Sequence, residues 1–164
     1  MQTLRYAFVI VLLALVACSD ISALQKSVLT PLNIKARLGG SVRELLQAHP
    51  NHQSAGDGMY YFQTSSPSGE KRTVRIRGEG DTIFWLQVQD ETIAAEANKE
   101  HRFFENEVDR LEGILGHAKQ QGVRTSSERI ASWTQNEKLK VIYRLDISAE
   151  PVFARRTLTI VRIK

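Results

Sequence analysis

The sequence predicts an α+β protein, with an antiparallel sheet of about six to seven strands and one short and one long helix packed on one face. Several segments alternate apolar and polar residues with a period of two, which is typical of half-buried strands. Residues 96–121 instead repeat apolar side chains at spacings of three and four, which is typical of an amphipathic helix. The predicted order is strand, helix, three strands, long helix, three strands.

The first predicted elements lie between residues 31 and 50. Residues 31–38 alternate, with Leu32, Ile34, Ala36 and Leu38 on one side, and this pattern predicts a strand. Ser41 followed by Glu44 three residues later is typical of a capping box. We therefore expect a short helix over residues 41–49, ended by Pro50.

The middle of the chain reads as a loop over residues 51–58, followed by strands over residues 59–64, 71–77 and 82–89. Turn-forming residues separate these three strands, which most simply form an antiparallel meander.

The long helix over residues 96–121 follows, with Gly122 as its expected C-cap. Three further strands are predicted at residues 129–135, 138–148 and 156–164. A tight turn at Asn136-Glu137 would join the first two of them.

The N-terminus differs in composition from the rest of the chain. Arg5 is the only charged residue before Cys18, and residues 6–17 are almost entirely apolar. This run is shorter than the roughly 20 residues that a helix needs to cross a bilayer. A charged start followed by a short apolar run indicates a signal peptide.

Cys18 is the only cysteine in the chain, and it directly follows Leu15-Val16-Ala17. This motif resembles the lipobox of bacterial lipoproteins, a family in which the cysteine sulfur receives a diacylglyceryl group before cleavage and acylation of the new N-terminus. The resemblance implies a signal peptide over residues 1–17 and a lipidated N-terminus and tether over residues 18–30. The length and patterning of the remainder predict a single α+β domain over residues 31–164. An ordinary secretory signal and a buried first helix of a cytosolic protein are the alternatives.

The same resemblance implies a place in the cell envelope, anchored to a membrane through Cys18 and facing the periplasm. In enterobacterial lipoproteins, aspartate directly after the cysteine favours the inner membrane; here Ser19 holds that position, which favours the outer membrane. The net charge of +4 is modest, and nucleic acid is not an expected partner in this compartment.

No pattern of catalytic residues stands out. His49 and His52 flank Pro50, while His101 and His117 are too far apart on the long helix to share a site, so the sequence predicts no metal. No G-x-S-x-G motif is present. We therefore expect a protein that is not an enzyme and that carries no cofactor.

Binding surfaces are the remaining candidates. Four large side chains follow one another in the strand over residues 59–64, and a strand with one buried face can hide only every second one. The candidate partner-binding residues are Met59, Tyr60, Tyr61, Phe62, Arg75 and Arg77. A basic patch could also include Arg72, Arg155 and Arg156. The alternatives are a strand buried on both faces and scattered surface charge.

Residues 39–50, GGSVRELLQAHP, and the following MYYF resemble small envelope lipoproteins of the BamE/SmpA group, although that family has two helices before its strands. Size and anchor are also similar to lipoproteins that serve as immunity partners of secreted effectors. These resemblances imply a lipid-anchored, non-catalytic protein-binding module, either an assembly accessory or an effector-immunity lipoprotein, with an envelope protein or a secreted effector as partner. The alternative is a small-ligand or lipid-binding lipoprotein with an apolar cavity between the sheet and the long helix; an envelope hydrolase is less expected.

Overall fold

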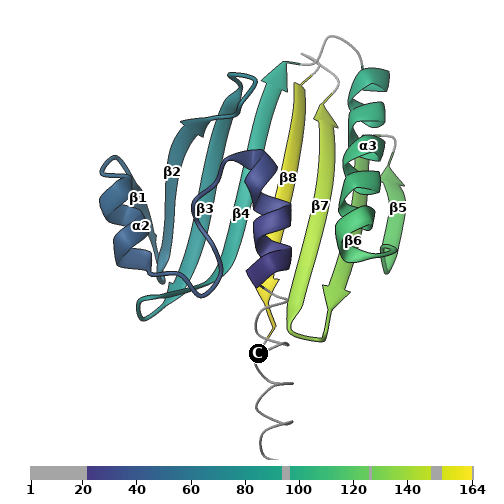
Figure 1. Cartoon of the computed structure of the whole chain (residues 1–164). Coiled ribbons are helices and arrows are strands. Elements are labelled where there is room, and N and C mark those ends of the chain that lie inside the picture. Colours follow the sequence, from purple (N-terminus) through teal and green to yellow (C-terminus); the bar gives the residue numbers. More distant parts are fainter. Residues whose placement is uncertain (1–21, 94–96, 126, 149–152, 164) are drawn as a thin grey trace, which may run out of the picture.

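The computed structural model describes residues 22–93, 97–125, 127–148 and 153–163. In these residues eight strands form one antiparallel sheet in the order β1-β2-β3-β4-β8-β7-β6-β5. The helix over residues 22–29, α2 and α3 all lie on one face of that sheet (Figure 1). The α+β class and the one-sided layering are therefore confirmed, with more strands and one more helix than the sequence predicts.

The additional helix occupies residues 22–29 and lies across β4 and β8 (Figure 1). It buries Gln25, Val28 and Leu29, with Leu24 packed against the same core, and these positions recur at the three- and four-residue spacing of one helix face. The tether expected over residues 18–30 is therefore a docked helix in the part that is described. Cys18, Ser19 and the expected signal peptide lie outside the described residues.

The strand expected over residues 31–38 is absent. Thr30–Leu32 forms a short 3-10 helix, η1, and the following residues run as an irregular segment over the sheet. The alternation is real, because Ala36 and Leu38 are buried in the core while Lys35 and Arg37 are exposed. It arises from packing on top of the sheet rather than from strand pairing. The Leu38 amide, for example, donates to the Gln25 side chain (2.9 Å).

Helix α2 (Val42–Ala48) begins as the sequence predicts, with the Ser41 hydroxyl accepting a hydrogen bond from the Glu44 amide (3.1 Å). A partner far along the chain completes this cap. The Asp81 carboxylate accepts from the Ser41 hydroxyl and from the Arg43 amide, both at 2.8 Å. The helix end is thereby fixed to the turn between β3 and β4.

The first half of the sheet comprises β1 (Gln53–Gly56), β2 (Met59–Ser65), β3 (Lys71–Glu79) and β4 (Thr82–Ile93). Strands β2, β3 and β4 form the predicted antiparallel meander. Strand β1 occupies part of the expected loop and pairs with β2. Gly58 is required in the turn between them, because its φ is +69° and a Cβ there would lie 2.6 Å from the Gly78 carbonyl oxygen.

Helix α3 (Ala97–Leu115) presents its predicted apolar stripe to β6 and β7. It ends earlier than expected, at Gly116, which has a φ of +76°. Gly122, the expected C-cap, instead lies in edge strand β5 (Gln120–Thr125). The buried residues of the stripe are Phe104, Val108, Leu111 and Leu115.

The second half of the sheet contains β6 (Glu128–Gln135), β7 (Leu139–Ser148) and β8 (Phe153–Arg162). The predicted turn at Asn136-Glu137 is present, and both residues have the positive φ that two-residue hairpin turns favour. Strand β8 pairs with both β4 and β7, so it joins the two halves into one sheet.

The hydrophobic core fills the space between the sheet and the three helices. Its central side chains are essentially inaccessible to solvent: Ile76, Leu86, Leu111, Val141 and Leu145 are each 0% exposed. Among the described residues, no helix combines the length and the apolar character needed to cross a membrane.

Candidate functional site

The two faces of the sheet differ in what covers them. Directly paired residues of an antiparallel sheet point to the same side, so Phe62, Val74, Val88, Leu158 and Tyr143 share the helix-covered face. The alternate positions point the other way, where no helix of the described residues lies (Figure 1). We call this side the uncovered face; it extends across both halves of the sheet.

The four consecutive large residues of β2 divide between the two faces. Phe62 is buried on the helix-covered face, and Tyr60 lies on the same face, where it lines an open surface hollow beside α2. Met59 and Tyr61 are on the uncovered face and are partly exposed. The alternation thus separates the sequence-predicted residues into two pairs.

The arginines divide in the same way. Arg75 is paired in register with Tyr61, and Arg77 with Met59, so all four side chains share the uncovered face. Arg155 lies on that face as well, opposite Glu91. Arg72 and Arg156 lie on the helix-covered face and are buried, so the five arginines do not form the single patch considered from the sequence.

Trp85 is a residue of this face that the sequence analysis missed. Strict alternation from Ile83, which is buried, would place Trp85 on the helix-covered face. The register shifts between Arg77 and Gly78, and this bulge pairs Trp85 with Arg77 on the uncovered face while Leu86 points into the core. The signal for a bulge was present only as the glycine at position 78.

Hydrogen bonds fix the side chains at the centre of the uncovered face. Arg75 donates to the side-chain oxygens of Gln87 (3.1 Å) and Gln89 (2.8 Å). Gln87 in turn donates to the Thr159 hydroxyl (3.3 Å), which links β3, β4 and β8. The result is an ordered polar surface rather than a set of independently moving side chains.

Charged side chains lie at both ends of the uncovered face. Towards one edge of the face, Arg155 pairs with Glu91 (3.3 Å) and Arg144 with Asp146 (2.8 Å). At the other end, Arg75 donates to the side chains of Gln87 and Gln89, and Arg77 donates to the Asp57 carbonyl oxygen (3.3 Å). Arg75 and Arg77 lie there beside Tyr61 and Trp85.

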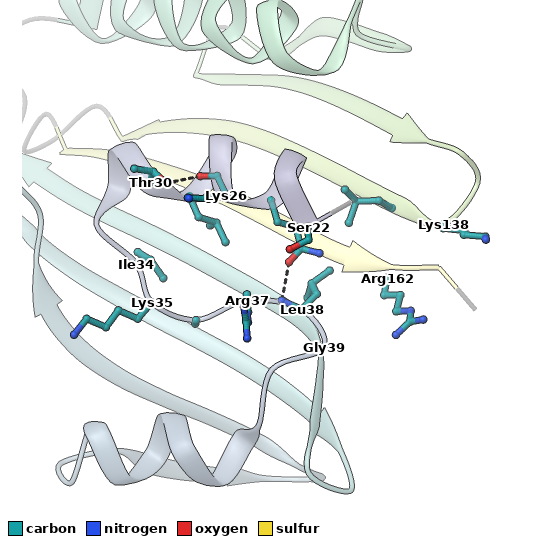
Figure 2. A pocket seen from close by; sticks show the side chains of 14 residues that line it. Ser22, Lys26, Thr30, Ile34, Lys35, Arg37, Leu38, Gly39, Lys138 and Arg162 are labelled. Atoms are coloured by element: carbon teal, nitrogen blue, oxygen red, sulfur yellow. Dashed lines mark hydrogen bonds between the residues drawn. The ribbon is translucent and has the colours of Figure 1, made fainter. Parts of the chain in front are cut away.

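A second feature lies on the opposite side of the sheet. A pocket of about 570 Å³ opens between the helix over residues 22–29, the segment over residues 34–39, and the ends of β7 and β8 (Figure 2). We call it the N-terminal pocket. The alternative considered from the sequence placed an apolar cavity between the sheet and the long helix. The N-terminal pocket lies elsewhere, and the apolar stripe of α3 packs directly on the sheet. Phe104 of that stripe, for instance, stacks on Tyr143 with ring centroids 5.2 Å apart.

Two of the histidines contact neighbouring side chains. His49 stacks on Phe62 with ring centroids 3.8 Å apart, and its pKa lies below the usual value because of partial burial and, secondarily, the charge of Lys35. His117 approaches Glu112 at 3.5 Å. In the described part of the chain, no group of three or more histidine, cysteine, aspartate or glutamate residues could hold a metal ion.

Buried ion pairs hold the ends of the strands beneath the helices. Arg72 binds both oxygens of Asp90, at 2.6 and 2.7 Å, and Arg156 binds both oxygens of Glu70, at 2.7 and 2.6 Å. Tyr143 lies in the same region, and its pKa is raised by burial and then by the nearby Glu107 carboxylate. The arginines are buried and their acidic partners are largely buried, so we assign these groups to folding rather than to a site.

Comparisons with protein-family models, with curated proteins and with solved structures find no match for this chain.

Proposed function

We propose that this chain is a lipid-anchored, non-catalytic protein-binding module of the bacterial cell envelope, and that it binds its partner through the uncovered face. The observation that supports this most directly is the one-sided layering, with all three helices on one face of the sheet (Figure 1). The residues that carry the contact would be Met59, Tyr61, Arg75, Arg77 and Trp85.

The uncovered face has the dimensions of a protein interface. Eight strands at about 4.8 Å spacing span about 34 Å, and their average length of about eight residues corresponds to about 27 Å. Their product is roughly 900 Å², comparable with the roughly 800 Å² that each partner buries in a standard complex.

The composition of the face supports a protein partner with an acidic surface. Aromatic residues, methionine and arginine are enriched in protein interfaces, and Trp, Tyr and Arg dominate binding energies. Here Tyr61 and Trp85 lie beside Arg75 and Arg77, whose guanidinium groups bond the Gln87 and Gln89 side chains and the Asp57 carbonyl oxygen. A carboxylate-rich patch on the partner would complement them.

The anchor part of the proposal rests on the lipobox-like motif. The first residue that the structure describes is Ser22, four residues after Cys18. Four extended residues span at most about 14 Å. An acylated Cys18 would therefore hold the domain close to the bilayer surface. Mass spectrometry of the mature N-terminus tests this part by itself: we expect a triacylated or diacylated Cys18, and a chain with unmodified thiol or with residues 1–17 retained would contradict it.

Site-specific photocrosslinking in the native envelope tests the surface. A photoreactive amino acid at Tyr61 or Trp85 should capture the same protein, whereas the same group at the exposed Asn106 on α3 should not. Capture at Asn106 but not at the two strand positions would overturn the assignment. The identity of the captured protein separates the two versions, an outer-membrane assembly component or a secreted effector.

Charge reversal provides a second readout of the same surface. Arg75→Glu with Arg77→Glu should reduce capture by at least about tenfold, because it turns attraction to an acidic patch into repulsion. Lys99→Glu with Arg102→Glu, two exposed positions on α3, changes the total charge equally and serves as the control. Equal loss in both double variants would mean that only the net charge matters and that the face is not the contact.

A further inference from the structure

We propose that the N-terminal pocket binds a phosphate-bearing anion, and that the source of this phosphate is the headgroup of an anionic phospholipid in the membrane that carries the anchor. The inference goes beyond the proposed protein-binding function, since it concerns the other side of the sheet. Only the choice of source draws on the expected anchor at Cys18.

The charge of the pocket lining is the first argument. Five of its fourteen lining residues are cationic and none is acidic; the five are Lys26, Lys35, Arg37, Lys138 and Arg162. The whole chain has 22 basic and 18 acidic residues, so its net charge of +4 is smaller than the charge of this one lining. Like charges gathered at one place repel one another, and a bound anion relieves that repulsion.

Three segments distant in the sequence bring these cations together. Lys26 comes from the helix over residues 22–29, Lys35 and Arg37 from the irregular segment after it, and Lys138 and Arg162 from the β7–β8 end of the sheet (Figure 2). In Figure 2, Arg37 and Arg162 lie nearer the middle of the view, whereas Lys35 and Lys138 point outward at its opposite ends. Arginine forks match the geometry of phosphate oxygens, whereas lysine contributes a point charge.

The pocket is also built and sized for a headgroup. Its volume of about 570 Å³ is within the range of roughly 300–1,000 Å³ that is usual for small-ligand sites. The hydrogen bond from the Leu38 amide to the buried Gln25 ties the helix to the irregular segment and fixes the two walls. Apolar side chains complete the lining and would contact the glycerol and the upper acyl chains: Leu29, Ile34, Ala36, Leu38 and Leu139.

The position of the pocket favours a lipid source. Ser22, the first described residue, is itself part of the lining, and it follows the expected lipidated cysteine by only four residues. A chain anchored at Cys18 would hold Ser22, one of the lining residues, within about 14 Å of the acylated cysteine. Anionic headgroups are concentrated at such a surface and attract basic segments.

The test uses the full lipidated protein, purified in a neutral detergent and titrated with short-chain phosphatidylglycerol. Phosphatidylcholine of the same chain length, glycerol phosphate and inorganic phosphate are titrated in parallel. Arg37→Gln with Arg162→Gln removes two cations from the pocket, and Lys99→Gln with Arg102→Gln removes two from α3 as the matched control. Thermal unfolding of each variant confirms that it folds.

We expect phosphatidylglycerol to bind the parent and the control protein equally, and the pocket variant at least about tenfold more weakly, because each lost charge-assisted hydrogen bond removes substantial binding free energy. Weaker binding of phosphatidylcholine and of both soluble phosphates would support the lipid source. Equal binding of glycerol phosphate would support the phosphate site but assign it to a free phosphate ester. Unchanged affinity in the pocket variant, or no saturable binding of any phosphate, would overturn the proposal. Neither result alters the crosslinking expected on the uncovered face.

Discussion

Arg72 is the residue at which the structure allows the sharpest stability prediction. Its guanidinium group binds both oxygens of Asp90, and its remaining Nη atom donates to the Leu32 carbonyl oxygen. The side chains of Arg72 and Asp90 are 3% and 15% exposed. One side chain therefore joins β3, β4 and the turn of η1, and it does so away from solvent.

Arg72→Met removes the charge and the donors but preserves most of the apolar volume. Asp90 would keep a largely buried carboxylate, and Leu32 would lose its donor. Arg156, the residue paired with Asp90 across the strands, is already bound to Glu70 and cannot fully replace Arg72. Breaking a buried pair at one partner costs about 3–5 kcal/mol. For a domain of this size, that loss corresponds to a fall in the melting temperature of roughly 10 °C.

Urea unfolding followed by circular dichroism measures this difference. The control is Arg155→Met. Arg155 is paired in register with Glu91, the residue after Asp90, and lies on the opposite face of the sheet from Arg72. Arg155 is 47% exposed in its pair with Glu91, and such exposed pairs contribute at most about 1 kcal/mol. Combining Arg72→Met with Asp90→Leu should restore part of the lost stability, because no buried charge is then left unpaired.

The reasoning fails if Arg72→Met and Arg155→Met reduce the free energy of unfolding by the same small amount. It also fails if the double replacement of Arg72 and Asp90 is less stable than the parent protein by the full sum of the two single effects, since that would mean that the two side chains do not interact.

Four further predictions concern separate parts of the fold. Because the pKa of His49 is lowered in the folded protein, the unfolded chain takes up a proton at a higher pH than the folded chain does. The free energy of unfolding should therefore fall as pH drops below about 6.5. His49→Phe should flatten this pH dependence in urea titrations at several pH values. Hydrogen bonds from the Arg43 amide and the Ser41 hydroxyl lower the pKa of Asp81. The stabilising effect of the Asp81 carboxylate is therefore present above the usual pKa of 3.8 and is lost as pH falls below that value. Asp81→Asn should remove this acid dependence from the unfolding curves. Leu111→Ala, at a position 0% exposed, should cost about 2–5 kcal/mol in equilibrium unfolding, and a loss below 1 kcal/mol would contradict the packing of α3. Gly58→Ala should destabilise the chain and increase hydrogen exchange in β1 and β2, because the added Cβ meets the Gly78 carbonyl oxygen; unchanged exchange would contradict the turn geometry.

The sequence predicted the elements that carry their own periodic signal. Alternation or strand-forming residues between turn signals predicted β2, β3 and β4 and the strands of the second half, and the three-and-four spacing predicted α3. The start of α2 was predicted because Ser41 and Glu44 form a local cap. In each case the residues that determine the element are neighbours in the chain.

Predictions from the sequence were wrong where the burial pattern had another cause. Residues 34–38 alternate because every second side chain contacts the sheet beneath, and alternation by itself does not reveal whether a segment pairs with a strand. The helix over residues 22–29 buries Gln25 together with its leucines, so its apolar stripe is interrupted and reads as a polar tether. The edge strands β1 and β5 are mostly exposed and have little apolar signal at all.

The residues of the candidate sites also differ in whether local sequence or long-range packing places them. Arg75 and Arg77 could be selected from the chain alone, because alternation shows which side chains a half-buried strand leaves outside, whereas Tyr61 was a candidate only together with Met59, Tyr60 and Phe62. Trp85 joined them only through a bulge between β3 and β4. That five cations line the N-terminal pocket could not be predicted from the sequence, because they come from positions up to 136 residues apart (Lys26 to Arg162).

By itself, the sequence determined the class of the fold, most strands, both predicted helices and the motif that favours an anchor at Cys18, because these depend on residues close together in the chain. Tertiary structure alone decided which face of the sheet stays uncovered and which charged side chains meet. Those outcomes depend on packing between distant segments, where burial and Coulomb interactions act through space and leave no periodic trace along the chain.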